Sequence, residues 1–146
     1  MSIVMPAVVL FIVSVKIAPG AAEVRGNVTI GSNNVINPLA TIIAEAGPII
    51  IGTDNVINDG VVIINRLAPG ETPSSTRVLR IGNNNVFGSE SHSEALKIGN
   101  NNVFGSKCFV GREVQVTDNN VVNAGCRLTC QQVVGPNAVT CGYQCA

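Results

Sequence analysis

The stretch from Ile98 to Val139 decides the fold, and it reads IGNNNV FGSKCF VGREVQ VTDNNV VNAGCR LTCQQV VGPNAV. An aliphatic or aromatic residue returns at every sixth position, namely at Ile98, Phe104, Val110, Val116, Val122, Leu128 and Val134. A short period that persists over this length is a repeat signature, and six-residue units are typical of a parallel β-helix. We expect each unit to form one flat face and one corner. Three units then return the chain to its starting face, about 4.8 Å further along the axis.

The same step is present upstream of this stretch, with interruptions. It runs through Val24, Ile30, Ile36 and Ile42, shifts by three residues at 44–48, and resumes at Ile51, Ile57 and Ile63. Two insertions are predicted to project as surface loops: Asn65–Arg80, rich in Pro, Gly, Ser and Thr, and the shorter Ser89–Lys97. Without them the chain makes about six coils of 18 residues. In this register Val110 points inward, and replacing Arg112 should matter far less than replacing Val110 if Arg112 faces solvent.

The composition fits a narrow aliphatic core and no nucleic-acid partner. The chain has 146 residues, of which 46% are hydrophobic, 12% charged and only 3% aromatic. This length predicts a single core. Nine Lys and Arg balance nine Asp and Glu, so the basic footprint of a nucleic-acid-binding protein is missing from the sequence. The low charge leaves much neutral surface, as is typical of a chain partly covered by partners.

The segment before Lys16 carries no charge. We divide the chain into this apolar segment, residues 1–14, which is an arm or a non-native start, and a β-helix domain at 15–146. The segment lacks a leading Lys or Arg and contains Pro6, which argues against a secretory signal. It is also too short to cross a bilayer as an ordinary helix. A first strand remains an alternative, as does a secreted or membrane-anchored protein, in which Asn27 of the motif Asn27-Val28-Thr29 would carry a glycan.

Residues 18 positions apart should stack in such a fold. Cys108 and Cys126 have this separation, and Asn85, Asn102 and Asn120 follow one another at 17 and 18 residues. We interpret the asparagines as a ladder whose amides bond along the axis, as stacked Asn side chains do in cross-β structures. The five cysteines lack C-x-x-C spacing, so we expect free thiols in a reducing compartment. A disulfide of Cys141 or Cys145 remains open.

The sequence predicts no catalytic, cofactor-binding or metal-binding residues. His92 is the single histidine, so a three-histidine zinc site is unavailable. His92 lies beside Glu90 and Glu94 in a polar segment, where it could act in principle as a general base, but we expect it to be a solvated loop residue. The alternative function is a hexapeptide-repeat enzyme, either an acyltransferase or a relative of carbonic anhydrase.

Several longer segments carry a resemblance that the period alone does not. They are VKIAPGA at 15–21, VRGNVTIG at 24–31, IIAEAGPIIIG at 42–52, NNVF at 84–87, ALKIG at 95–99 and SKCFVGR at 106–112. Together they resemble the dynactin subunit 6 family over roughly residues 15 to 143. The most specific element is the break AEAGP followed directly by IIIG, since isolated hexapeptides occur in many β-helices.

The resemblance implies a left-handed β-helix with a structural and non-catalytic role. It implies membership of the dynactin pointed-end complex, pairing with dynactin subunit 5, contact with an actin-related protein, and support of dynein-driven transport and cargo attachment. The implied location is the cytoplasm and cytoskeleton, without nucleic acid or direct membrane insertion. The sequence departs from the family in its apolar start and in lacking the C-terminal helical segment and tail. Because the ends of a β-helix expose unpaired edges, we expect another chain to cover them.

Overall fold

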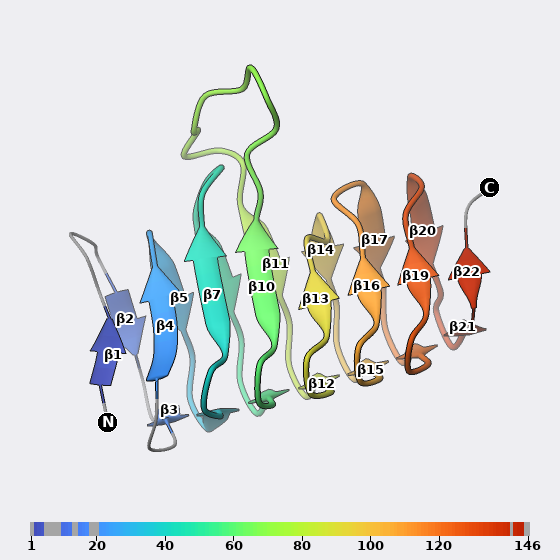
Figure 1. The fold of residues 1–146 in the computed structure, drawn as a ribbon, viewed down its shortest axis with the longest axis horizontal. Helices are drawn as coiled ribbons and strands as arrows, with labels where there is room; N and C mark the ends of the chain where they lie inside the picture. The colour runs from blue at the N-terminus through green and yellow to red at the C-terminus, as the bar shows by residue number, and fades with distance from the viewer. Residues whose placement is uncertain (1, 5–9, 13–14, 18–20, 141, 145–146) are drawn as a thin grey trace.

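The computed structural model describes residues 2–4, 10–12, 15–17, 21–140 and 142–144, and all of their regular elements are β-strands. The strands stack into three parallel sheets that wind as a solenoid along one long axis (Figure 1). We call the three sheets face A, face B and face C. The described residues contain no helix of the length and hydrophobicity needed to span a membrane. The predicted parallel β-helix is confirmed.

Each turn of the solenoid contributes one strand to each face. Face A has the order β1 (Ser2–Val4), β4 (Ala21–Arg25), β7 (Thr41–Ala44), β10 (Val62–Asn65), β13 (His92–Ser93), β16 (Phe109–Val110), β19 (Arg127–Leu128) and β22 (Tyr143–Gln144). Face B has the order β2 (Leu10–Ile12), β5 (Val28–Ile30), β8 (Ile49–Ile51), β11 (Leu79–Ile81), β14 (Lys97–Ile98), β17 (Val114–Val116) and β20 (Gln132–Val134). Face C has the order β3 (Val15–Ile17), β6 (Asn34–Ile36), β9 (Val56–Ile57), β12 (Val86–Phe87), β15 (Val103–Phe104), β18 (Val121–Val122) and β21 (Val139–Thr140).

The solenoid has about seven turns, one more than the sequence predicted. The additional turn comes from the start of the chain, where β1, β2 and β3 pair in parallel with β4, β5 and β6. The apolar segment at 1–14 therefore contains two strands of the sheets. The division of the chain after residue 14 stays a prediction.

The sixth-position residues form three stacked columns that fill the interior. Backbone pairing aligns them within each face, for example Val110 with Ser93 and Leu128 on face A. The columns are Val24, Ile42, Ile63, Ser93, Val110 and Leu128 on face A, Ile30, Ile51, Ile81, Ile98, Val116 and Val134 on face B, and Ile36, Ile57, Phe87, Phe104 and Val122 on face C, and all of these side chains are buried. Packing of this kind between successive turns is what stabilises a repeat protein.

Close stacking explains the glycine at the second position of many units. A Cβ atom at Gly99 would lie 2.5 Å from the carbonyl oxygen of Thr117 in the next turn, and one at Gly82 would lie 2.6 Å from the carbonyl oxygen of Gly99. Real Cβ atoms do not approach this closely, so only glycine allows the turns to meet at this corner.

The predicted asparagine ladder is confirmed, and it is longer than predicted. Asn34, Asn55, Asn85, Asn102 and Asn120 are fully buried at the corner between faces B and C. Amide-to-amide hydrogen bonds run from Asn55 to Asn34 (3.0 Å), from Asn85 to Asn55 (3.1 Å) and from Asn102 to Asn85 (3.1 Å). The residue before each ladder asparagine has φ between 58° and 59°, the left-handed conformation that Asn and Asp tolerate best.

The prediction of a second insertion at Ser89–Lys97 is wrong. This segment forms a regular corner, then β13 and the start of β14. Ser91, Ser93 and Ala95 are buried at inward positions where neighbouring turns carry larger side chains. The same turn contains Phe87, whose ring stacks on that of Phe104 at a centroid distance of 4.7 Å. The first insertion does project from the solenoid, between β10 and β11 (Figure 1).

The cysteines divide between two states. Cys108 and Cys126 are buried and are not disulfide-bonded. Burial and the neighbouring Cys126 raise the pKa of the Cys108 thiol to about 12, so this thiol stays protonated at neutral pH. Cys130 is disulfide-bonded, contrary to the expectation of a free thiol at this position. The thiol state of Cys141 and Cys145 lies outside the described residues.

Candidate functional site

The outer side of face A carries a column of polar and aromatic side chains. Pairing aligns His92 of β13 with Phe109 of β16, and Phe109 with Arg127 of β19. The His92 and Phe109 rings stack at a centroid distance of 5.2 Å, and the Arg127 guanidinium lies 4.7 Å from the centre of the Phe109 ring. Such a cation over an aromatic face is attracted by the ring quadrupole.

His92 is therefore a strand residue with specific contacts, and the expectation of a solvated loop histidine is wrong. Its Nε2 atom lies 2.8 Å from Oε2 of Glu94, and the same carboxylate oxygen lies 2.8 Å from Nε of Arg66. Arg66 begins the loop at 66–78, which we call the β10–β11 loop. The histidine thus helps to fix this loop over face A through Glu94. Because Nε2 faces a carboxylate, the orientation of the imidazole ring is fixed.

Arg112 holds the β10–β11 loop at a second point. Its guanidinium bonds to the carboxylate of Glu71, lies 3.1 Å from Oε1 of Glu113, and donates to the carbonyl oxygen of Arg66 at 3.2 Å. Arg77 adds a weaker contact to Glu71 at 3.3 Å. Only 21% of the Arg112 side chain is exposed, so the condition that it faces solvent is met only in part. The contact spans 41 residues of sequence, which no local pattern could reveal.

The carboxylate of Glu71 titrates below its ordinary range. The backbone N–H of Ala68, which donates to Oε1 at 2.9 Å, and the guanidinium of Arg112 lower the pKa of Glu71 from its usual value of 4.5. A carboxylate with a depressed pKa stabilises the bound loop above the pKa of the free side chain. This contribution is lost as the pH falls through the depressed pKa of the folded protein. We therefore expect the loop to loosen only in acid, below about pH 4.5.

Replacing Arg112 with alanine is expected to release the loop while leaving the solenoid folded. The contacts are ion pairs near the surface, and such pairs typically contribute about 1 kcal/mol or less. We expect limited proteolysis with proteinase K to cleave the loop several times faster in Arg112→Ala, with little change in the thermal midpoint. Arg80→Ala is the matched control, because Arg80 is exposed and makes no ion pair or side-chain hydrogen bond with another described residue. Equal cleavage of Arg112→Ala and Arg80→Ala would show that Arg112 does not hold the loop.

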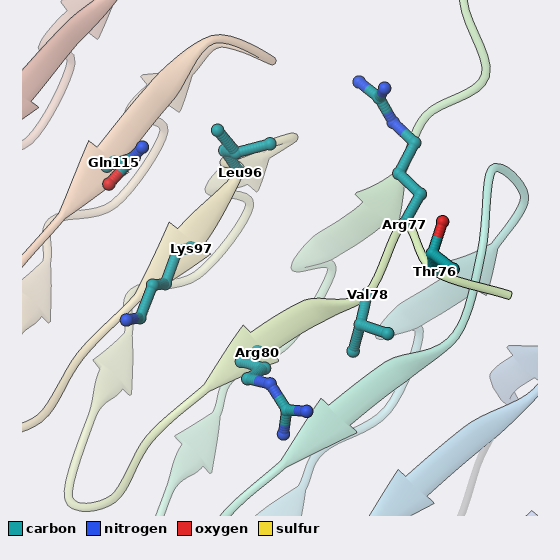
Figure 2. Close-up of a pocket in the computed structure, with 7 residues that line it drawn as sticks. All are labelled: Thr76, Arg77, Val78, Arg80, Leu96, Lys97 and Gln115. Atoms are coloured by element: carbon teal, nitrogen blue, oxygen red, sulfur yellow. The ribbon is translucent and has the colours of Figure 1, made fainter. Parts of the chain in front are cut away.

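A hollow on the described surface lies between the end of this loop and face B. It has a volume of about 420 Å³ and is lined by Thr76, Arg77, Val78, Arg80, Leu96, Lys97 and Gln115. Figure 2 shows Arg80, Lys97 and Gln115 on the neighbouring strands β11, β14 and β17, with Thr76 to Val78 leading into β11. Arg80 and Lys97 are exposed and adjacent in register. This arrangement can attract an acidic side chain of another protein, but it lacks the buried polar groups that orient a small substrate.

Among the described residues, no three His, Cys, Asp or Glu side chains converge in a way that could hold a metal ion. Histidine and cysteine are the side chains that most often ligate zinc. Here His92 contacts Glu94 on the outer side of face A, whereas the Cys108 thiol is buried and protonated in the interior.

Comparison with known proteins supports the resemblance found in the sequence. The chain is 43% identical to dynactin subunit 6 of Xenopus tropicalis over 140 residues, which covers 90% of this chain and 70% of that protein. It is 46% identical over 127 residues to dynactin subunit 6 of Nematostella vectensis, covering 85% and 69%, and 43% identical over 141 residues to that of Danio rerio, covering 90% and 72%.

A solved structure shows the same fold with a distant sequence. UDP-N-acetylglucosamine acyltransferase of Francisella novicida superimposes with a TM-score of 0.59 at 18% identity, covering 95% of this chain and 61% of that one. This likeness concerns the fold alone. No family model matches the sequence. At 43–46% identity over most of its length, and with the solenoid that the repeat predicts, the chain belongs to the dynactin subunit 6 family.

Proposed function

We propose that this chain is a non-catalytic structural subunit of the dynactin pointed-end complex, where it pairs with dynactin subunit 5 and lies near the actin-related protein. In this role it supports dynein-driven transport and cargo attachment in the cytoplasm, at the cytoskeleton. The observation that carries the proposal is the identity of 43–46% to three dynactin subunit 6 proteins over 85–90% of the chain.

The chemistry of the molecule agrees with a role in assembly. The interior is filled by aliphatic columns and a hydrogen-bonded asparagine ladder. His92 is occupied by Glu94 and a stacked phenylalanine, and the free thiol of Cys108 is protonated. The flat outer faces of the sheets and the anchored β10–β11 loop are available for binding. Surfaces of this kind suit contact with other proteins.

The alternative of a hexapeptide-repeat acyltransferase or carbonic anhydrase relative requires a base or a metal site. No specific observation in the described residues favours it, because the likeness to the acyltransferase is one of fold. Stoichiometric zinc in the purified protein, together with carbon dioxide hydration, would overturn the structural role.

Co-expression with dynactin subunit 5 tests the proposal. We expect the two chains to purify as a soluble one-to-one pair, and the chain alone to self-associate or aggregate, because its apolar surfaces then lack a partner. Analytical ultracentrifugation measures both states. A stable monomer with no affinity for subunit 5 would contradict the proposal.

A further inference from the structure

The outer side of face C carries one valine in each turn from β6 to β21, and Lys16 of β3 pairs with the first of them. Pairing aligns Val35, Val56, Val86, Val103, Val121 and Val139 in a single column from β6 to β21, which we call the valine stripe. Val103 is 43% exposed and Val139 69% exposed, and both belong to the few large hydrophobic side chains on the described surface. The stripe covers five strand spacings of about 4.8 Å, or about 24 Å of the solenoid axis.

Face C is uncharged from β6 to β21, whereas the other two faces carry charge. The outward positions that follow its strands are Asn37, Asn58, Gly88, Gly105 and Asn123. The first two asparagines bond to each other at 3.1 Å. By contrast, face B carries Arg80 and Lys97, and face A carries His92, Glu94 and Arg127. An apolar strip flanked by asparagine and glycine, with the charged pair Glu90 and Lys107 further out at the corner toward face A, has the composition of an interface centre with a polar rim.

We propose that the valine stripe is the docking surface for a second parallel β-solenoid that presents an uncharged aliphatic face. This inference rests on the proposed function, in which the partner is dynactin subunit 5. Sheets pack face to face at about 10 Å when both surfaces are flat and apolar. A neutral stripe offers no charge pair to a charged partner, and burying an unpaired charge of that partner against it would cost free energy.

The spacing of the stripe favours a solenoid over a helix as the occupant. A partner solenoid repeats at the same strand spacing of about 4.8 Å, so its aliphatic side chains stay in register with the valines along the whole stripe. A helix repeats every 5.4 Å and would be about 3 Å out of register after five rows. A stable pair buries about 800 Å² on each partner, which is more than a single column provides. The stripe is therefore the centre of the contact, with the asparagine corners at its margin.

Val103→Glu in the full chain, co-expressed with dynactin subunit 5, tests the inference. Val103 lies between Val86 and Val121, so its replacement places a carboxylate in the middle of the stripe. We expect the dissociation constant for subunit 5 to rise at least 100-fold. The matched control is Val133→Glu, because Val133 is 63% exposed on the outer side of face B. Its affinity should stay within about twofold of the parent, and both variants should keep the parent's circular dichroism and thermal midpoint.

Val103→Asn removes the apolar side chain without adding charge, and it replaces the glutamate variant if that one fails to fold. Unchanged binding by a folded Val103 variant would overturn the inference and leave the proposed function intact. Loss of binding by Val133→Glu alone would place the contact on face B and would also overturn the inference.

A parent chain without affinity for subunit 5 would overturn the proposed function together with the inference. If Val103→Glu abolished only pairing between two copies of this chain, the proposed occupant would be wrong.

Discussion

Replacing Val110 with aspartate is expected to unfold the C-terminal turns of the solenoid. Val110 is fully buried and stacks between Ser93 and Leu128 in the inward column of face A. An aspartate there would be an uncompensated buried charge, which typically costs on the order of 3–5 kcal/mol. Because whole domains are stable by only about 5–15 kcal/mol, this loss should remove much of the stability. Chemical denaturation followed by circular dichroism measures it.

The matched control for this experiment is Val133→Asp, which introduces the same side-chain change at an exposed position of face B. Surface substitutions usually alter the free energy of unfolding by about 0.5 kcal/mol or less. We therefore expect Val133→Asp to unfold close to the parent midpoint. Equal stability of Val110→Asp and Val133→Asp would show that the inward register is wrong.

Replacing Asn102 with alanine is expected to cost about 2–4 kcal/mol, because a broken ladder leaves buried backbone groups unpaired. The Asn102 side chain donates to Asn85 Oδ1 at 3.1 Å and to the carbonyl oxygen of Thr117 at 2.7 Å. Its own oxygen accepts from the backbone N–H of Asn120 at 2.9 Å. Alanine removes all three bonds at a site without exposure to solvent.

Asn123→Ala serves as the control for the ladder, since Asn123 is exposed. Urea denaturation of both variants should separate them, with Asn102→Ala unfolding at a clearly lower midpoint. If the two midpoints coincided, the ladder would contribute no more than surface asparagine, and its role in holding the corner between faces B and C would be disproved.

The interior could be predicted from the sequence wherever the six-residue step is carried by aliphatic residues. The inward positions of Val110 and Leu128 can be predicted because hydrophobic residues at a fixed period must share one side of the chain. The step is lost where small residues take inward positions. Ser91 and Ser93 are buried, but the sequence around them looks like a polar loop, so the prediction placed an insertion there. A search for aliphatic residues at a six-residue period does not detect inward positions that serine occupies.

The contacts and exposed patches on the surface were harder to predict from the sequence than the interior. The bond between Arg112 and Glu71 joins residues 41 apart and depends on how the β10–β11 loop folds back, which no repeat encodes. The valine stripe did leave a signal, because Val103, Val121 and Val139 are 18 residues apart. Each valine directly precedes an inward residue, so its outward direction follows from strand alternation once the register is known. The asparagine ladder likewise extended to Asn34 and Asn55, where three-residue shifts and the loop hide the 18-residue spacing.

Sedimentation of a tagged full chain in cell extract measures whether this chain is a subunit of dynactin. We expect the chain to co-sediment with dynactin on a glycerol gradient and to co-purify with dynactin subunit 5 in equal amounts. The Val103→Glu variant should shift to the slow fractions, and Val133→Glu should remain with the complex. A parent chain that sediments only as a free monomer or as a homo-oligomer, without subunit 5, would contradict the claim.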